Sequence, residues 1–181
     1  MTMGAIKKMP VALLYGSIAA LGMIGVTTLS YLRGTQAFIG SAAYLMYVFP
    51  LVLAVVAALA EKRRKAGLLP FRDALKACFG VIVLSLAVQT LFTWILVKWI
   101  DPAFGRSLPA AVLTKMEATS RQFHIPEEDI ASSLAEQKKS DPFGVGPMLT
   151  GLARNYIVAF PVAVLFAAVI GQRIVNRPPK A

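Results

Sequence analysis

Residues 77–100 read ACFGVIVLSLAVQTLFTWILVKWI, and this stretch decides the fold class of the chain. It contains one charged side chain, that of Lys98, which lies between Trp94 and Trp99 as an interfacial anchor would. A helix needs about 20 apolar residues to cross the hydrocarbon core of a bilayer, because each residue advances the helix by about 1.5 Å. The stretch is therefore long enough and apolar enough to be a membrane span.

Three further stretches have the same length and apolar character: residues 10–32, 38–60 and 146–170. The 181-residue chain is 57% hydrophobic and 15% charged, which is unlike the composition of ordinary soluble domains. The first apolar run is too long for a signal peptide, so we expect it to be retained as a span. The sequence predicts an all-α, four-helix transmembrane bundle, with residues 1–181 forming a single integral membrane domain.

The placement of charge predicts the orientation of these spans, since Lys and Arg favour cytoplasmic loops. With four spans, three basic regions fall on one side of the membrane: residues 7–8, 62–76 and 173–180. We therefore expect both termini to lie in the cytoplasm. The net charge of +10 follows this topology pattern, so nucleic acid is not an expected partner.

Residues 101–145, between the third and fourth spans, form a polar segment with five basic and seven acidic residues. Val112, Met116, Thr119 and Phe123 recur at helical spacing and predict a short amphipathic helix. Pro126 suits the first position of a second helix, whose acidic first turn matches the positive end of the helix dipole. We expect a helical hairpin that lies outside the cytoplasm.

The turn of this hairpin holds the residues that we consider for contact with a protein partner: Arg121, His124, Glu127 and Glu128. His124 and the neighbouring carboxylates also include ligand types that metals use. However, their spacing crosses a proline-broken turn, and the chain has no second histidine. A solvated turn with acids placed at a helix N-terminus accounts for the same residues, so we expect no metal site.

Arg154 is the charge of most interest within the apolar stretches, because an ionisable residue inside a span is a functional candidate. One interpretation is a cavity in which Arg154 contacts an anion or a lipid. The other is a position near the membrane boundary, from which the side chain reaches the headgroups.

Lys62, Arg63, Arg64 and Lys65 form a basic run that could contact anionic headgroups, or serve as the topology signal alone. Beyond this run, residues 71–79 suggest an interfacial helix leading into the third span, within which Asp73 and Lys76 can pair. Ala12, Gly16 and Ala20 form a row of small residues on the first span that another helix could approach closely.

Several chemistries lack the residues that they need. One histidine argues against bis-histidine haem, and Cys78, the single cysteine, argues against a disulfide oxidase. The middle of each predicted span lacks an acid of the kind that proton-coupled exporters use. We therefore expect no cofactor and no enzymatic activity.

Short motifs across the chain resemble one known family. FRDALKACF (71–79) leads into the third span, IDPAF (100–104) closes it, MEATSRQFHIPEEDI (116–130) lies in the polar segment, and GQRIVNR (171–177) ends the last span. Together they resemble domain-of-unknown-function family 4199, a family of uncharacterised four-span membrane proteins. The resemblance implies an integral protein of the bacterial inner membrane. It implies no activity, so no catalytic residue is carried over.

These observations lead to one functional expectation and one alternative. We expect a non-enzymatic structural or interaction component of an envelope complex, with the hairpin and the small-residue row as contact surfaces and the lipid bilayer as surroundings. The alternative is a small transporter or a protein that binds lipid or another hydrophobic ligand through Arg154. Four spans leave little interior for a pore, so formation of a homo-oligomer stays open.

Overall fold

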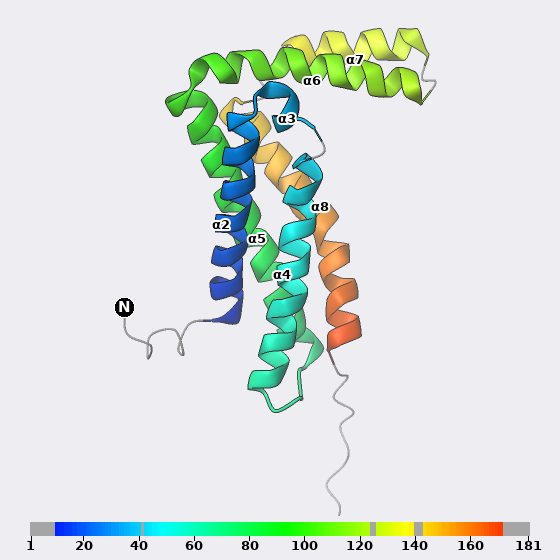
Figure 1. The fold of residues 1–181 in the computed structure, drawn as a ribbon. Coiled ribbons are helices and arrows are strands. Elements are labelled where there is room, and N and C mark those ends of the chain that lie inside the picture. Colours follow the sequence, from blue (N-terminus) through cyan, green and yellow to red (C-terminus); the bar gives the residue numbers. More distant parts are fainter. Residues whose placement is uncertain (1–9, 41, 124–125, 140–142, 172–181) are drawn as a thin grey trace, which may run out of the picture. The chain divides into compact units, whose positions relative to one another are not determined.

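The computed structural model describes residues 10–40, 42–123, 126–139 and 143–171, and the elements in these ranges are helices (Figure 1). In chain order they are α2 (Val11–Leu32), α3 (Thr35–Phe38), α4 (Ala42–Arg64), α5 (Phe71–Ile95), the π-helix η1 (Leu96–Ile100), α6 (Pro102–Gln122), α7 (Glu127–Lys139) and α8 (Val145–Ile170). The predicted all-α class is confirmed.

Among the described residues, three helical stretches are long and apolar enough to cross a bilayer: α2, α5 together with η1, and α8. The bounds of α2 and α8 lie within one residue of the predicted spans 10–32 and 146–170. Helix α5 begins at Phe71, so residues 71–79 belong to the same helix as the predicted third span. A crossing by α4 stays a prediction, and with it the count of four spans. Helix α4 starts after the short helix α3, later than the predicted start at residue 38.

The chain forms two compact units, and α2, α4, α5 and α8 each contribute residues to both. Unit 1 comprises Met1–Gly22, Tyr47–Leu86 and Asn155–Ala181, and unit 2 comprises Met23–Met46 and Ala87–Arg154.

Small residues make up much of the buried interior of unit 1. The fully buried alanines are Ala19, Ala54, Ala57, Ala58, Ala74, Ala163 and Ala167. Small side chains let helix backbones approach closely, which is how helices associate in lipid, where burying apolar surface gives no driving force. The buried alanines therefore allow the segments of α2, α4, α5 and α8 in unit 1 to pack closely. In the same unit, the Tyr156 hydroxyl donates to the Val83 carbonyl at 3.0 Å, and the ring of Phe160 packs edge-on against Phe79.

The link from α4 to α5 is a tight helix ending within unit 1. Gly67 has φ +88° and donates its N–H to the Lys62 carbonyl at 2.9 Å. This left-handed conformation at a helix C-terminus favours glycine, since other side chains are strained there. Leu69 follows and is 1% exposed, so the link is anchored in the interior of unit 1.

In unit 2 the chain turns from η1 into α6 at Asp101. The Asp101 N–H donates to the Leu96 carbonyl at 2.8 Å, five residues back, which is the π-helical pattern. The Asp101 carboxylate then accepts from the Phe104 N–H at 2.9 Å, and Pro102 occupies the first turn of α6. An aspartate N-cap followed by proline is a favoured helix start, so the sequence IDP accounts for the turn.

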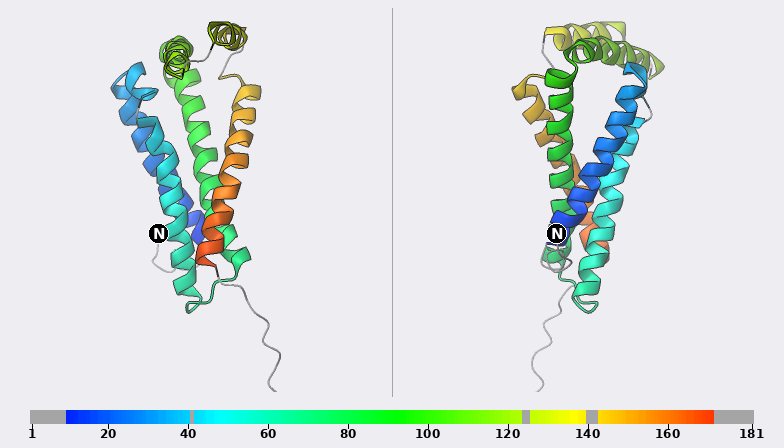
Figure 2. Two further views of the ribbon diagram at one scale, coloured as in Figure 1. Left: turned by 90° about the vertical axis from the view of Figure 1, so that its right-hand side faces the viewer. Right: turned by 60° about the vertical axis from the view of Figure 1, so that its left-hand side comes forward.

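Helix α6 approaches η1 through a glycine. A Cβ atom on Gly105 would lie 2.3 Å from the Val97 carbonyl oxygen, so the close backbone approach excludes any other residue at this position. Helices α6 and α7 lie side by side in Figure 1, and both views of Figure 2 agree. The predicted short helix around residues 112–123 is part of the longer α6, which starts at Pro102.

Candidate functional site

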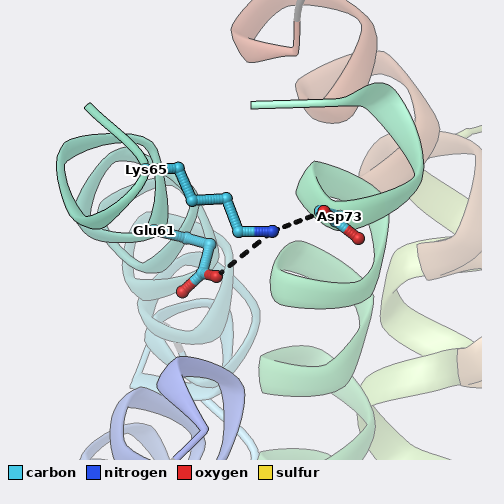
Figure 3. A network of polar contacts seen from close by, with 3 residues as sticks. All are labelled: Glu61, Lys65 and Asp73. Carbon is cyan, nitrogen blue, oxygen red and sulfur yellow. Dashed lines mark hydrogen bonds and ion pairs between the residues drawn. The ribbon is translucent and has the colours of Figure 1, made fainter. Parts of the chain in front are cut away.

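Two lysines of the basic run at the end of α4 make contacts within the protein. The Lys62 ammonium donates to the Ile170 carbonyl at 3.0 Å, which caps the C-terminal end of α8 within unit 1. The Lys65 ammonium lies between Asp73, at 2.5 Å, and Glu61, at 3.8 Å (Figure 3). The hydrogen bond to Asp73 raises the pKa of Lys65. Two of the four predicted headgroup contacts therefore hold helix ends together.

Arg63, Arg64 and Lys65 are exposed, and Lys62 is half-buried. Headgroup contact through the run stays a prediction.

The predicted pairing of Asp73 with Lys76 is replaced by the Asp73–Lys65 ion pair. Local spacing along α5 suggested the first pair, because residues three apart lie on one helix face. The tight turn at Gly67 brings the last residues of α4 beside the first turn of α5, and Lys65 takes the carboxylate instead (Figure 3).

The small-residue row on α2 faces α5 within unit 1. A Cβ atom on Gly16 would lie 2.9 Å from the Leu84 side chain, and one on Gly80 would lie 2.9 Å from the Ala12 Cβ. Ala20 is also buried, at 3% exposure. The row is thus covered by the protein's own helix, and the expectation that it serves as a contact surface for a partner is wrong.

Three charged side chains lie in contact at the end of α6 and the start of α7. The Arg121 guanidinium contacts Glu117 at 2.8 Å and Glu127 at 3.1 Å, so it joins the last turn of α6 to the first turn of α7. Glu128 is exposed beside them. His124, the fourth predicted contact residue, lies outside the described residues. Of the predicted contacts, the structure therefore brings Arg121 and Glu127 together.

Arg154 is exposed on α8, ten residues into the helix. Its neighbours one helical turn further along the same face are Ile157 and Val158, which are 72% and 66% exposed. The structure therefore gives Arg154 an outward position on an apolar helix face.

A buried polar cluster in unit 2 joins α2 to α5. The Thr27 hydroxyl donates to the Met23 carbonyl at 2.9 Å, so its oxygen is left to accept from Gln89 Nε2, at 2.5 Å. The same Nε2 donates to Thr93 Oγ1 at 3.2 Å. Gln89 is 6% exposed, and its Oε1 has no hydrogen-bond partner among the described residues.

A second polar contact in unit 2 ties the end of α2 to the start of α6. The Tyr31 hydroxyl donates to Asp101 Oδ2 at 2.9 Å, and the rings of Tyr31 and Phe38 pack edge-on against Phe104. The Phe104 N–H, and then the Tyr31 hydroxyl, hold the pKa of Asp101 below its ordinary range. Both groups stabilise the carboxylate form.

Sequence reasoning missed the Tyr31–Asp101 and Gln89–Thr27 bonds, because each joins residues more than sixty positions apart. A weak signal existed for the second: Gln89 is a strongly polar residue deep in an apolar stretch, and such a residue needs a partner.

Within the described ranges, no group of three or more His, Cys, Asp or Glu side chains is placed so that it could hold a metal ion. Cys78 is fully buried and donates to the Ala54 carbonyl across unit 1.

Comparison with curated proteins found no match, and comparison with solved structures found none either. The family of proteins of unknown function DUF4199 matches over residues 12–173. This range takes in α2 through α8 and most of the motifs quoted from the sequence, so the chain belongs to the DUF4199 family.

Proposed function

We propose that the protein is a multi-pass component of a bacterial inner membrane that holds a partner protein through the α6–α7 pair, without catalysing a reaction. In this proposal the chain crosses the bilayer four times, both termini are cytoplasmic, and α6 and α7 lie on the outer side. The bias of Lys and Arg towards three regions of the chain supports this orientation.

The observation that carries the proposal is the exposed surface formed by the end of α6 and the start of α7. Phe123 is 74% exposed at the end of α6, next to the Arg121–Glu127 ion pair. Aromatic and arginine side chains are the residue types that most often anchor protein interfaces. Here a large apolar ring stands in a polar segment beside charges that are already held in place.

The basic run and the small-residue row were the other candidate contact surfaces, and both make contacts within the protein. This also favours the exposed ends of α6 and α7 as the contact surface. Lys62, Lys65 and Gly16 are each engaged by the protein itself. In contrast, the ring of Phe123 and the carboxylates of Glu127 and Glu128 are exposed, so a partner could contact them.

The test is site-specific photo-crosslinking of the full chain in native membranes. A photoreactive residue replaces Phe123 in one variant, and Val169, which is 85% exposed on the apolar face of α8, in the control. We expect one protein to crosslink through position 123 and not through position 169. We further expect that crosslink to fall when Glu127→Lys and Glu128→Lys are combined, and to persist with Arg63→Glu. Lipid alone at position 123, or equal protein capture at both positions, contradicts the proposal.

A further inference from the structure

Arg154 stands at a definite depth along α8. The Ile170 carbonyl, at the C-terminal end of α8, accepts a hydrogen bond from the Lys62 ammonium. We therefore place this end of the helix at the charged boundary of the membrane. Sixteen residues separate Arg154 from Ile170, which is about 24 Å of helix. The hydrocarbon core of a bilayer is about 30 Å thick. If α8 spans the membrane, the Arg154 Cα lies roughly 6 Å inside the opposite boundary.

The direction of the side chain shortens this distance. The Cα–Cβ bonds of an α-helix tilt towards its N-terminus, so a side chain covers the turn that precedes it. Arg154 therefore extends over Thr150 and Gly151, towards the membrane boundary nearest the start of α8. A long cationic side chain at this depth places its head at the interface while its stem stays in the acyl region.

The preceding turn leaves room for a ligand. Gly151 carries no side chain. In the described part of the chain, no atom apart from its chain neighbours and the nearby backbone of α8 lies within 4 Å of the position that its Cβ would occupy. Thr150 is exposed, and its hydroxyl can donate a hydrogen bond. The open position at Gly151, the hydroxyl of Thr150 and the guanidinium of Arg154 therefore lie on one face of α8.

We infer that Arg154, with the Thr150 hydroxyl and the notch at Gly151, binds the phosphate group of a phospholipid in the leaflet at the N-terminal end of α8. A guanidinium at the edge of an apolar region needs an opposite charge, and its planar fork matches two phosphate oxygens. The exposed apolar residues Ile157 and Val158 extend from this point along the acyl chains. The inference rests on α8 spanning the bilayer and is independent of the α6–α7 contact.

The experiment is native mass spectrometry of the full chain, released from detergent with phosphatidylglycerol or phosphatidylethanolamine added. We expect at least a tenfold loss of bound phospholipid in Arg154→Gln and a smaller loss in Arg154→Lys. Gly151→Leu keeps the charge but fills the notch, and we expect it to lose lipid as well. Arg33→Gln, just after the end of α2, changes an exposed arginine outside the predicted headgroup contacts. It is the matched control and retains wild-type binding.

Three outcomes overturn the inference. The first is equal lipid retention by wild type and Arg154→Gln. The second is a loss of the same size in Arg33→Gln, which marks general charge attraction. The third is displacement of the lipid by millimolar inorganic phosphate, which marks an anion site with no preference for lipid. Circular dichroism confirms folding, and Gly151→Ala replaces Gly151→Leu if the larger residue unfolds the protein. Crosslinking at position 123 proceeds unchanged in Arg154→Gln, so the two proposals fail separately.

Discussion

The contact between Gly80 and Ala12 makes a quantitative prediction about unit 1. In Gly80→Ala, the new methyl carbon would lie 2.9 Å from the Ala12 Cβ. Carbon atoms pack best at about 3.5–4.0 Å, so α2 and α5 must separate by roughly 0.6 Å or more. Such overpacking costs about 1–3 kcal/mol. Alanine is also the better helix former by about 1 kcal/mol, which partly offsets the clash.

A double-mutant cycle separates the two effects. In the Ala12→Gly background the clash is gone, and the helix-propensity gain at position 80 remains. The difference between the effects of Gly80→Ala in the two backgrounds therefore gives the steric term alone, and we expect a coupling free energy of about 1–3 kcal/mol.

The assay is reversible unfolding by sodium dodecyl sulfate in mixed micelles, followed by circular dichroism, on the wild type, both single variants and the double variant. Gly25→Ala is the control, because among the described residues no atom beyond its chain neighbours and the nearby backbone of α2 lies within 4 Å of the position of a Cβ there. We expect Gly25→Ala to be neutral or stabilising. A coupling energy under about 0.5 kcal/mol would be indistinguishable from additivity and would refute the close approach of α2 and α5.

Three other substitutions test the polar contacts by the same unfolding assay. Lys62→Met removes the cap from the last carbonyl of α8 and should cost about 0.5–1 kcal/mol, whereas Arg63→Met should cost less. Thr27→Val leaves a buried Gln89 amide without its closest partner and should cost about 1–3 kcal/mol, against under about 0.5 kcal/mol for the exposed Thr28→Val. Because the pKa of Asp101 is lowered on folding, its contribution to stability is present above about pH 4 and is lost as the pH falls through the lowered value. The loss of stability between pH 7 and pH 3 should therefore be smaller in Asp101→Asn than in wild type, and equal losses would contradict the assigned contacts.

The helices follow from the sequence because their signals are local. Apolar runs fix α2 and α8 to within a residue, since length and composition decide whether a helix suits a bilayer. The start of α6 is also encoded locally, because Asp101 followed by Pro102 is a strong helix start. The apolar periodicity alone predicted only the later part of this helix, from residue 112.

Contacts between residues far apart in the sequence could not be predicted from local sequence patterns. Asp73 has Lys76 three residues away on its own helix, yet the Gly67 turn presents Lys65, and only the folded chain shows which cation arrives. The small-residue row identified a close helix approach, but not that α5 makes it. For Arg154 the sequence left a cavity and a boundary position open, and the exposure of the side chain supports the boundary.

The π-helical turn at Leu96–Ile100 bears on how the length of this chain can vary between related proteins. A π-turn closes over five residues where an α-turn closes over four, so η1 holds one residue more than a regular helix would. Removing one residue there would restore the α-helical spacing. Because the π-turn already holds the extra residue within a single turn, the residues behind it would keep nearly their present direction. Asp101 would then still face Tyr31, and α6 would begin in nearly the same direction. Substitutions at these five positions leave the spacing intact, so a one-residue deletion tests it in a way that no exchange of side chains can.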